Sequence, residues 1–215
     1  MAKRFIKSIL FLIIIAVVVS KMSDETPSPE FSRFMKVSAE GNMLKAWSGP
    51  WACIYDTETG LIWEVKRDDE SIHDGYWTYS WYDYMVGEEN LGDCYFEEDR
   101  CDTQDIITKT NSEKLCDIQG WRLPTKLEFE SIIIEQDREN KAHTAVDYFS
   151  EIKNGDYWTS HSNEDLKGHF SYLKKGAISF NFYQKKFNYL PYRNAAFVML
   201  VSDKTRQGKF LPNSQ

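Results

Sequence analysis

The segment from residue 120 to residue 128 constrains the fold of this chain more than any other stretch of its sequence. It reads Gly-Trp-Arg-Leu-Pro-Thr-Lys-Leu-Glu. Proline restricts the backbone of the residue before it, so Leu123 must remain extended ahead of Pro124. Thr125 and Glu128 have the spacing of a capping box, in which each side chain accepts a hydrogen bond from a free backbone N–H at a helix start. The segment therefore predicts a short extended piece that leads directly into a helix.

Two helices are predicted in the middle of the chain. The first spans residues 104–115 and starts at Asp102 or Thr103, either of which can act as its cap. Its inner side carries Ile106, Ile107 and Leu115. The second helix follows the capping box and carries Leu127, Ile132, Ile133 and Ile134.

Short strands are predicted on both sides of the helices. They span residues 51–56, 61–66, 157–160, 168–174, 177–183 and 194–202. The first two form a hairpin around a turn in which Gly60 supplies a positive φ. The strands at 168–174 and 177–183 form a second hairpin, and the alternation of Ile178, Phe180 and Phe182 with polar residues indicates one buried face. Strands, two helices and then antiparallel strands predict an α+β fold.

The first twenty residues are typical of an export signal. Lys3, Arg4 and Lys7 form a basic start, and residues 8–20 are free of charge and largely apolar. The apolar run is shorter than the roughly 20 residues of a membrane span. A small-x-small cleavage pattern is missing at Ser20, so removal of the leader and its retention as an N-terminal anchor both remain open. Either case predicts an exported protein that is periplasmic, at the cell surface or secreted, with an inner-membrane anchor if the leader is retained.

The rest of the chain is expected to form one domain with flexible ends. Residues 21–44 contain Pro27 and Pro29 among small polar residues and are predicted to be a linker. Residues 45–203 form the predicted domain, and residues 204–215 form a C-terminal tail. Most of the seven tryptophans are expected in the core. Trp77 and Trp81 lie in a polar, tyrosine-rich segment and are the two expected to be accessible.

Four cysteines follow the apolar leader, and an even number in an exported protein indicates disulfides. Three pairings are possible. The favoured one joins Cys94 to Cys101 as a local clip on an acidic loop. It joins Cys53 to Cys116, which ties the first hairpin to the first helix. A zinc site is disfavoured because no Cys-x-x-Cys pair and no histidine at ligand spacing is present.

These phrases together resemble the Lcl C-terminal-domain family, formerly a domain of unknown function. The resemblance rests on Cys-Ile-Tyr-Asp at residue 53, Thr-Gly-Leu-Ile-Trp at residue 59, Trp-Arg-Leu-Pro-Thr at residue 121 and Tyr-Trp-Thr-Ser at residue 157. It extends over nearly the whole domain, from Trp51 to Val201. An Arg-Leu-Pro-Thr helix start also resembles the formylglycine-generating-enzyme superfamily. Both families are associated with the C-type-lectin-like fold, so the resemblance implies that architecture.

The resemblance implies an exported bacterial protein. One type of member is an adhesin that binds sulfated glycosaminoglycans, often as a trimer. The present chain differs from that type because no Gly-x-y repeat lies ahead of the domain. A homo-oligomer remains one of the expected partnerships, without a trimer being implied.

Basic and aromatic residues alternate near the end of the domain. Residues 166–202 contain six basic side chains and no acidic one. A cation can bind the anionic group of a sulfated or carboxylated sugar, and a ring face can contact the sugar itself. The predicted ligand-binding residues are Lys174, Lys175, Lys185, Lys186, Arg193, Tyr183 and Tyr189. The alternatives are a solvated hairpin or a basic face that docks on the acidic loop of a second copy.

The acidic residues concentrate elsewhere. Between Asp83 and Asp105 there are nine acids and one base. These carboxylates could bind Ca²⁺, but the spacing of a dedicated calcium loop is absent, so a solvated acidic loop is favoured. The chain carries a formal charge of −7, and loss of the three basic residues in the leader would leave −10. That charge and the export signal argue against nucleic acid as a partner.

Catalytic patterns are weak in this sequence. The four histidines lack metal-ligand spacing, and Ser160 does not lie in a Gly-x-Ser-x-Gly elbow. We therefore expect no enzyme, no cofactor and no metal. The sequence predicts a non-catalytic, exported recognition domain that binds anionic glycans in the manner of an adhesin. The alternative is a structural or assembly component that binds another envelope protein.

Overall fold

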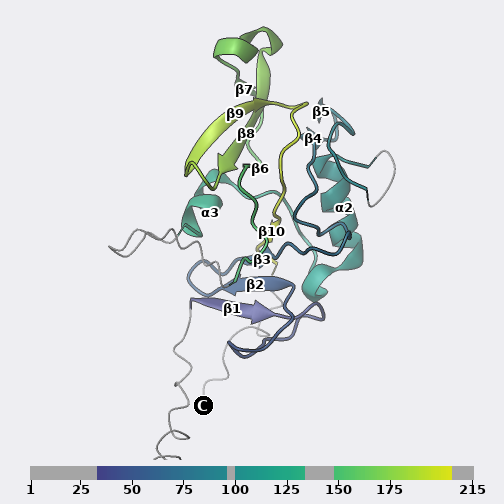
Figure 1. Cartoon of the computed structure of the whole chain (residues 1–215), viewed down its shortest axis with the longest axis vertical. Coiled ribbons are helices and arrows are strands. Elements are labelled where there is room, and N and C mark those ends of the chain that lie inside the picture. The colour runs from purple at the N-terminus through teal and green to yellow at the C-terminus, as the bar shows by residue number, and fades with distance from the viewer. Residues whose placement is uncertain (1–32, 96–99, 134–147, 205–215) are drawn as a thin grey trace, which may run out of the picture. The chain divides into compact units, whose positions relative to one another are not determined.

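The computed structural model of the chain describes residues 33–95, 100–133 and 148–204 (Figure 1). Over these ranges the fold is α+β, with short strands in antiparallel sheets and two α-helices, which confirms the predicted class. The predicted leader, residues 21–32 of the predicted linker and nearly all of the predicted tail lie outside the described residues. In the described ranges, no helix is long and apolar enough to cross a membrane.

One four-stranded sheet joins the beginning and the end of the domain. Its strands are β1 (Phe34–Val37), β2 (Cys53–Asp56), β3 (Ile62–Glu64) and β10 (Val201–Ser202), in the order β1-β2-β3-β10. The turn between β2 and β3 contains Gly60 at φ 72°, as predicted. Because β10 comes from the end of the domain and pairs with β3, this sheet closes the fold.

Strand β1 corrects the predicted boundary between linker and domain. Phe34 and Val37 are buried, and β1 pairs with β2 from Phe34↔Asp56 to Val37↔Cys53. Arg33 donates two hydrogen bonds to the Asp56 carboxylate, at 2.9 and 2.7 Å. The folded domain therefore includes Arg33 and β1, which precede the predicted boundary at residue 45. The prolines before β1 predicted a linker, but the apolar side chains of β1 are buried where it pairs with β2.

The second sheet is built around β8. Its strands are β6 (Asp156–Trp158), β7 (Glu164–Asp165), β8 (Lys175–Asn181) and β9 (Lys186–Pro191). One edge of β8 pairs with β6 and β7, and the other pairs with β9 over its length. The prediction that a strand at residues 168–174 pairs with β8 is wrong, because residues 168–173 form the 3₁₀-helix η2 (Gly168–Leu173). The hairpin partner is β9, the next segment along the chain. A small hairpin of β4 (Tyr82–Asp83) and β5 (Val86–Gly87) stands apart.

Both helices have the predicted caps. Helix α2 (Thr103–Glu113) begins at Asp102, and α3 (Lys126–Ser131) begins at Thr125 with the capping box to Glu128. A short 3₁₀-helix, η1 (Leu115–Asp117), follows α2. Helix α3 is shorter than predicted, and its Leu127 is 76% exposed. Its fully buried residue is Phe129, while Ile132 and Ile133 follow the helix and Ile134 lies outside the described residues.

The core consists of two clusters, and the first sheet contributes to both. Ile62 of β3 packs in one cluster with Trp121 and Trp158. Its neighbour Trp63 packs in the other, where the Phe129 ring lies 5.8 Å from Trp63 and 5.7 Å from Phe180. Successive residues of a strand point to opposite faces, so β3 is covered on both sides. Helix α3 thus attaches the second sheet to the first.

The disulfide pairing is the favoured one. Cys53 is bonded to Cys116, with their Cα atoms 6.5 Å apart, and Cys94 is bonded to Cys101, with a Cα separation of 5.7 Å. The first bond connects β2 to η1, directly after α2. Two disulfides fit an extracellular or periplasmic protein.

Candidate functional site

The predicted ligand-binding residues are all exposed, but they do not form one site. Lys185, Lys186 and Tyr183 lie at or beside the turn between β8 and β9. Lys174, Lys175 and Arg193 lie at the opposite end of this hairpin, and Tyr189, 48% exposed, lies on β9 between the two groups. Gly176 and Asn181 of β8 pair with β9 near the two ends of the hairpin. They are five residues apart, which corresponds to about 17 Å along the strand. A single small ligand cannot contact both ends.

At the Lys175 end, an acidic group already neutralises part of the positive charge. Lys175 Nζ lies 2.8 Å from Asp165 Oδ1 and donates a hydrogen bond to the Asn163 carbonyl at 3.0 Å. A pocket of about 120 Å³ at this end is lined by both Arg193 and Glu88. The acid wall and the Asp165 partner make this end a poor site for a polyanion.

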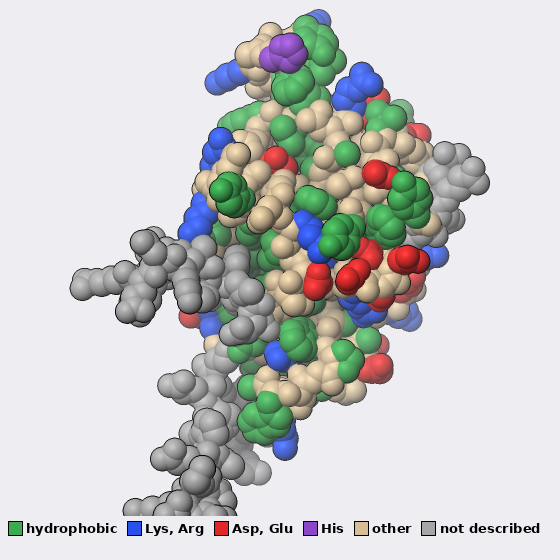
Figure 2. Space-filling view, viewed as in Figure 1, with side chains coloured by type: hydrophobic (Ala, Val, Ile, Leu, Met, Phe, Trp, Pro, Cys, Tyr) green, Lys and Arg blue, Asp and Glu red, His purple; other side chains and the backbone are tan. Residues whose placement is uncertain are grey.

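At the turn end, a third lysine contacts the hairpin that carries the two predicted ones. Lys126 at the start of α3 places its ammonium 4.8 Å from the centre of the Phe187 ring, next to Lys186 on β9. We call Lys126, Lys185 and Lys186 the lysine cluster. In the described part of the chain, none of the three has an acidic partner within 4.0 Å. Figure 2 shows basic side chains along the edge where α3 and this turn lie, whereas acidic side chains gather toward α2.

The turn that carries Lys185 and Lys186 is held by a partly buried carboxylate. The Asp156 carboxylate accepts hydrogen bonds from Ser179 Oγ and Asn188 Nδ2, both at 2.8 Å, and from Asn181 Nδ2 at 3.3 Å. Asn181 Oδ1 in turn accepts the Gln184 N–H of the turn at 2.9 Å. The polar residues Ser179 and Asn181 are therefore buried, which corrects the prediction that β8 buries one face. Alternation predicted solvent on that face, but Asp156 of β6 satisfies its polar groups.

Arg122 has a structural role. Its guanidinium donates to both oxygens of Glu128, at 2.8 and 2.6 Å, and to the Leu123 carbonyl at 3.2 Å. Its backbone pairs with Val201 in both directions. The interaction locks the extended piece to the start of α3. The same segment meets the Tyr-Trp-Thr-Ser phrase, because the Ser160 N–H donates to the Pro124 carbonyl at 2.9 Å.

The two tryptophans expected to be accessible are largely covered. Trp81 is 3% exposed and donates its indole N–H to the Thr159 carbonyl, and Trp77 is partly buried. Trp47 is the tryptophan with a large exposed fraction, 73%. The polar residues around positions 77–81 suggested that the two rings are exposed, but other segments of the chain cover them.

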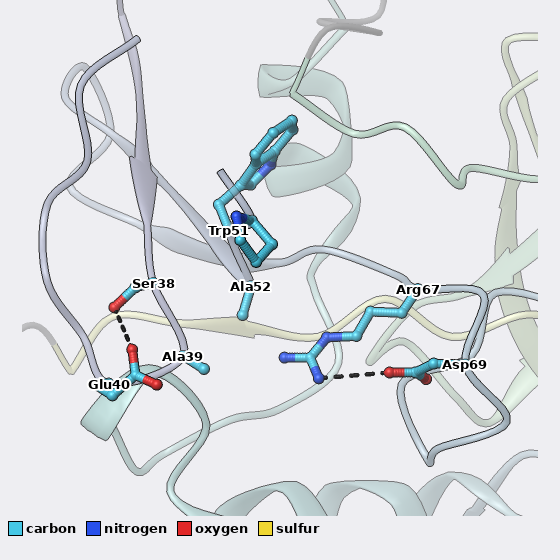
Figure 3. Close-up of a pocket in the computed structure, with 8 residues that line it drawn as sticks. Ser38, Ala39, Glu40, Trp51, Ala52, Arg67 and Asp69 are labelled. Atoms are coloured by element: carbon cyan, nitrogen blue, oxygen red, sulfur yellow. Dashed lines mark hydrogen bonds and ion pairs between the residues drawn. The ribbon is translucent and has the colours of Figure 1, made fainter. Parts of the chain in front are cut away.

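A separate pocket of about 540 Å³ lies between the loop after β1, the residues before β2 and the loop after β3 (Figure 3). Its lining residues are Ser38, Ala39, Glu40, Pro50, Trp51, Ala52, Arg67 and Asp69. The Arg67 side chain extends across the pocket, and its Nη1 lies 3.6 Å from Asp69 Oδ2. Nothing in the sequence predicted this pocket, because its walls come from three separated segments.

Residues 52–202 match the sequence profile of the Lcl C-terminal domain. The chain belongs to the Lcl C-terminal domain family. The matched region runs from just before β2 into β10 and contains both disulfides, the lysine cluster and Arg67. No curated protein and no solved structure matches the chain.

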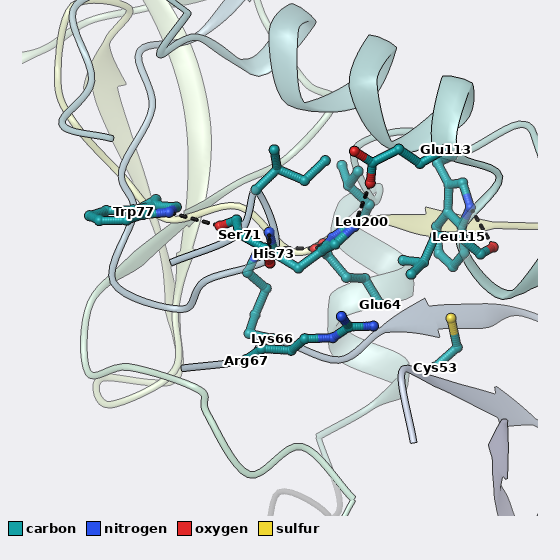
Figure 4. A network of polar contacts seen from close by, with 12 residues as sticks. Cys53, Glu64, Lys66, Arg67, Ser71, His73, Trp77, Glu113, Leu115 and Leu200 are labelled. Atoms are coloured by element: carbon teal, nitrogen blue, oxygen red, sulfur yellow. Dashed lines mark hydrogen bonds and ion pairs between the residues drawn. The ribbon is translucent and has the colours of Figure 1, made fainter. Parts of the chain in front are cut away.

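This Lcl C-terminal domain also contains a buried charged network beneath the first sheet (Figure 4). Glu64 Oε1 accepts hydrogen bonds from Lys66 Nζ at 2.9 Å and interacts with His73 Nδ1 at 2.7 Å. Glu64 Oε2 accepts the Leu200 N–H at 2.9 Å. The side chains of Glu64, Lys66 and His73 are at most 5% exposed. The network connects β3 to the segment before β10 and has no open face for a substrate, so we assign it to stability.

Among the residues that the structure describes, no group of three or more His, Cys, Asp or Glu side chains could hold a metal ion. The acidic stretch itself is described except for residues 96–99. Two of its members have a structural use, since Asp102 and Asp105 form the capping box of α2.

The network makes the stability of the domain depend on pH. Burial alone would raise the pKa of Glu64, but Lys66 and His73 outweigh burial and lower it to about 2. Because this value lies below the usual 4.5, the contribution of Glu64 is fully present above about pH 5 and is lost as the pH falls toward 2. We expect the difference in unfolding free energy between the wild type and Glu64→Gln to shrink between about pH 6 and pH 3. Denaturant titrations at each pH measure it, and a constant difference would contradict the assignment.

Proposed function

We propose that this Lcl C-terminal domain is a non-catalytic, exported recognition domain that binds an anionic glycan through the lysine cluster. The observation that supports it is that Lys185 and Lys186 at the β8–β9 turn, and Lys126 packed on the adjacent Phe187 ring, have no acidic partner within 4.0 Å among the described residues. Ammonium groups bind sulfate and carboxylate groups, and repeated anions on one polymer can contact several lysines together. The C-type-lectin-like architecture belongs to the same proposal, and the antiparallel α+β fold with two disulfides is consistent with it.

The surrounding residues suit a sugar polymer. Tyr183, 77% exposed, lies in the same turn as Lys185 and offers a ring face beside the cations. The Asp156 hydrogen bonds hold the turn in place, so little ordering is required on binding. The overall charge of −7 confines attraction for a polyanion to local basic surface.

Retention on immobilised heparin, used as a sulfated-glycan probe, tests this proposal. We expect Lys185→Glu with Lys186→Glu to abolish retention. We expect salt to elute the wild type, because salt screens charge–charge interactions beyond a Debye length of about 8–10 Å at 0.10–0.15 M. The matched control is Lys109→Glu with Lys114→Glu. It makes the same change in net charge on exposed residues at and beside α2 and should elute like the wild type. Retention of the first variant at wild-type salt would reject the lysine cluster as the binding surface.

A second candidate function is contact with another envelope protein through the β4–β5 hairpin. Its tip exposes Tyr84, Met85 and Val86 by 73%, 91% and 45%. Adjacent exposed apolar side chains are typical of a protein interface. Cross-linking in cells, with and without Tyr84→Ser and Met85→Ser, tests this alternative. A partner lost with these substitutions but kept with the lysine substitutions would favour the assembly function.

A further inference from the structure

The Arg67 pocket differs from the lysine cluster in chemistry. Its lining contains one cation, Arg67, two carboxylates, Glu40 and Asp69, and the apolar residues Pro50, Trp51, Ala39 and Ala52. A hydrogen bond from the Ser38 side chain lowers the pKa of Glu40. Burial by itself would raise the pKa of Asp69, but hydrogen bonds from Ser71 outweigh burial and lower it. Both carboxylates are thus anionic at neutral pH. A ligand with several negative charges is disfavoured here.

Arg67 is held less closely by its acidic neighbour than Arg33 and Arg122 are by theirs. Arg33 and Arg122 each form two short hydrogen bonds with a carboxylate, between 2.6 and 2.9 Å. Arg67 lies 3.6 Å from Asp69, which is longer than a bidentate pair. Its planar fork of donors projects into the pocket (Figure 3). A carboxylate entering the pocket can form the bidentate pair that Asp69 does not.

The walls of the pocket are held rigidly before any ligand arrives. Arg67 donates its N–H to the His73 carbonyl at 2.9 Å and accepts the Gly75 N–H at 2.8 Å. The Asp74 carboxylate accepts the N–H groups of Asp69 and Glu70, at 3.1 and 2.9 Å. On the opposite wall, Trp51 donates its indole N–H to the Tyr148 carbonyl at 2.9 Å, and Lys36 Nζ lies 3.6 Å from its ring centre. Such preorganisation lowers the ordering cost of binding.

We propose that this pocket binds a small zwitterion, an α-amino acid with an apolar side chain. The ligand carboxylate pairs with Arg67 and the ligand ammonium pairs with Asp69. Both groups of an α-amino acid are attached to one carbon, so their partners must be close neighbours, as Arg67 and Asp69 are. The side chain of the ligand then lies against Pro50 and Trp51. The volume of about 540 Å³ is within the range of small-molecule pockets. This binding is independent of the proposed glycan recognition.

Calorimetry on the full chain with three related probes tests the proposal. L-Phenylalanine has both charged groups, its amide lacks the carboxylate, and its N-acetyl derivative lacks the ammonium. We expect L-phenylalanine to bind, and each derivative to bind at least about tenfold more weakly. If the N-acetyl derivative binds as tightly as the amino acid, the ammonium is not recognised and the zwitterion proposal is wrong. Absence of binding of L-phenylalanine at about 10 mM also overturns it.

Substitutions locate the binding. Arg67→Met should weaken L-phenylalanine about tenfold or more and leave the weak binding of the amide unchanged, whereas Lys109→Met on α2 should bind like the wild type. The indole N–H resonance of Trp51 should shift on titration with L-phenylalanine in the wild type. An unchanged affinity in Arg67→Met, or an unshifted Trp51 signal at saturation, would place the amino acid elsewhere and reject the assignment. The probe series on the wild type decides the outcome even if Arg67→Met fails to fold.

Discussion

Replacing Glu64 by leucine should destabilise the domain by about 3–5 kcal/mol, because it leaves the Lys66 ammonium buried without its anion. Glu64 also accepts the Leu200 N–H, so the substitution removes the acceptor of a backbone donor just before β10. An unpaired buried cation and an unsatisfied N–H act in the same direction. Denaturant unfolding of the wild type and variant at neutral pH measures the loss.

A second substitution separates the charge from the packing. Lys66→Met removes the buried cation, so Glu64→Leu with Lys66→Met should be more stable than Glu64→Leu alone and recover about half of the loss. The matched control is Glu113→Leu. Glu113 lies 3.5 Å from His73 but its side chain is 45% exposed, so its loss should cost well under about 1 kcal/mol. Equal effects of the Glu64 and Glu113 substitutions would mean that the buried network does not stabilise the fold.

Removal of the Cys53–Cys116 disulfide should cost about 4 kcal/mol. The two cysteines are 63 residues apart, and a cross-link over a long segment restricts the unfolded chain more than one over a short segment. Cys53→Ala with Cys116→Ala also removes two sulfur atoms from the core, since both residues are at most 1% exposed. Denaturant titrations of this variant and of the oxidised wild type measure the difference in unfolding free energy.

The second disulfide provides the control for that experiment. Cys94 and Cys101 are 7 residues apart, so Cys94→Ala with Cys101→Ala should cost about 2 kcal/mol, roughly half as much. The reverse order of the two costs would show that local packing around each bond, and not the length of the closed segment, sets its contribution.

Local features of the sequence predicted local features of the fold. The caps at Asp102 and Thr125 depend on side chains three residues apart, and both are present. Gly60 has the positive φ predicted for the tight turn between β2 and β3. Each of these predictions concerns a few consecutive residues, so no information on the rest of the chain was required.

Predictions that depended on distant partners were less successful. Strand β1 was assigned to a linker because of the prolines and small polar residues before it, yet Phe34 and Val37 pair with residues of β2. The strand that pairs with β8 was placed before it, whereas β9 follows it. Alternation identified the core face of β8, but the burial of Ser179 and Asn181 depends on Asp156, more than twenty residues away.

The same division applies to the candidate sites. Lys185 and Lys186 were predicted from their own surroundings, whereas the contact of Lys126 with Phe187 of the same hairpin depends on the tertiary structure. Lys175 and Arg193 were predicted to be part of the same site and lie at the other end of the hairpin. The Arg67 pocket was not predicted, since Ser38, Trp51 and Arg67 have no common pattern in the sequence.

By itself, the sequence determined the family, the α+β class, the disulfide-bonded character and the helix caps of this protein, because each depends on residue types at short spacing. Tertiary structure alone decided that Lys126 packs on Phe187 of the β8–β9 hairpin, which side chains are buried around Glu64 and where a pocket opens beside Arg67. The physical reason is that these arrangements arise from contacts between segments far apart in the chain. Such contacts form because apolar surface has to be buried, and the polar groups on the same segments are carried into place with it.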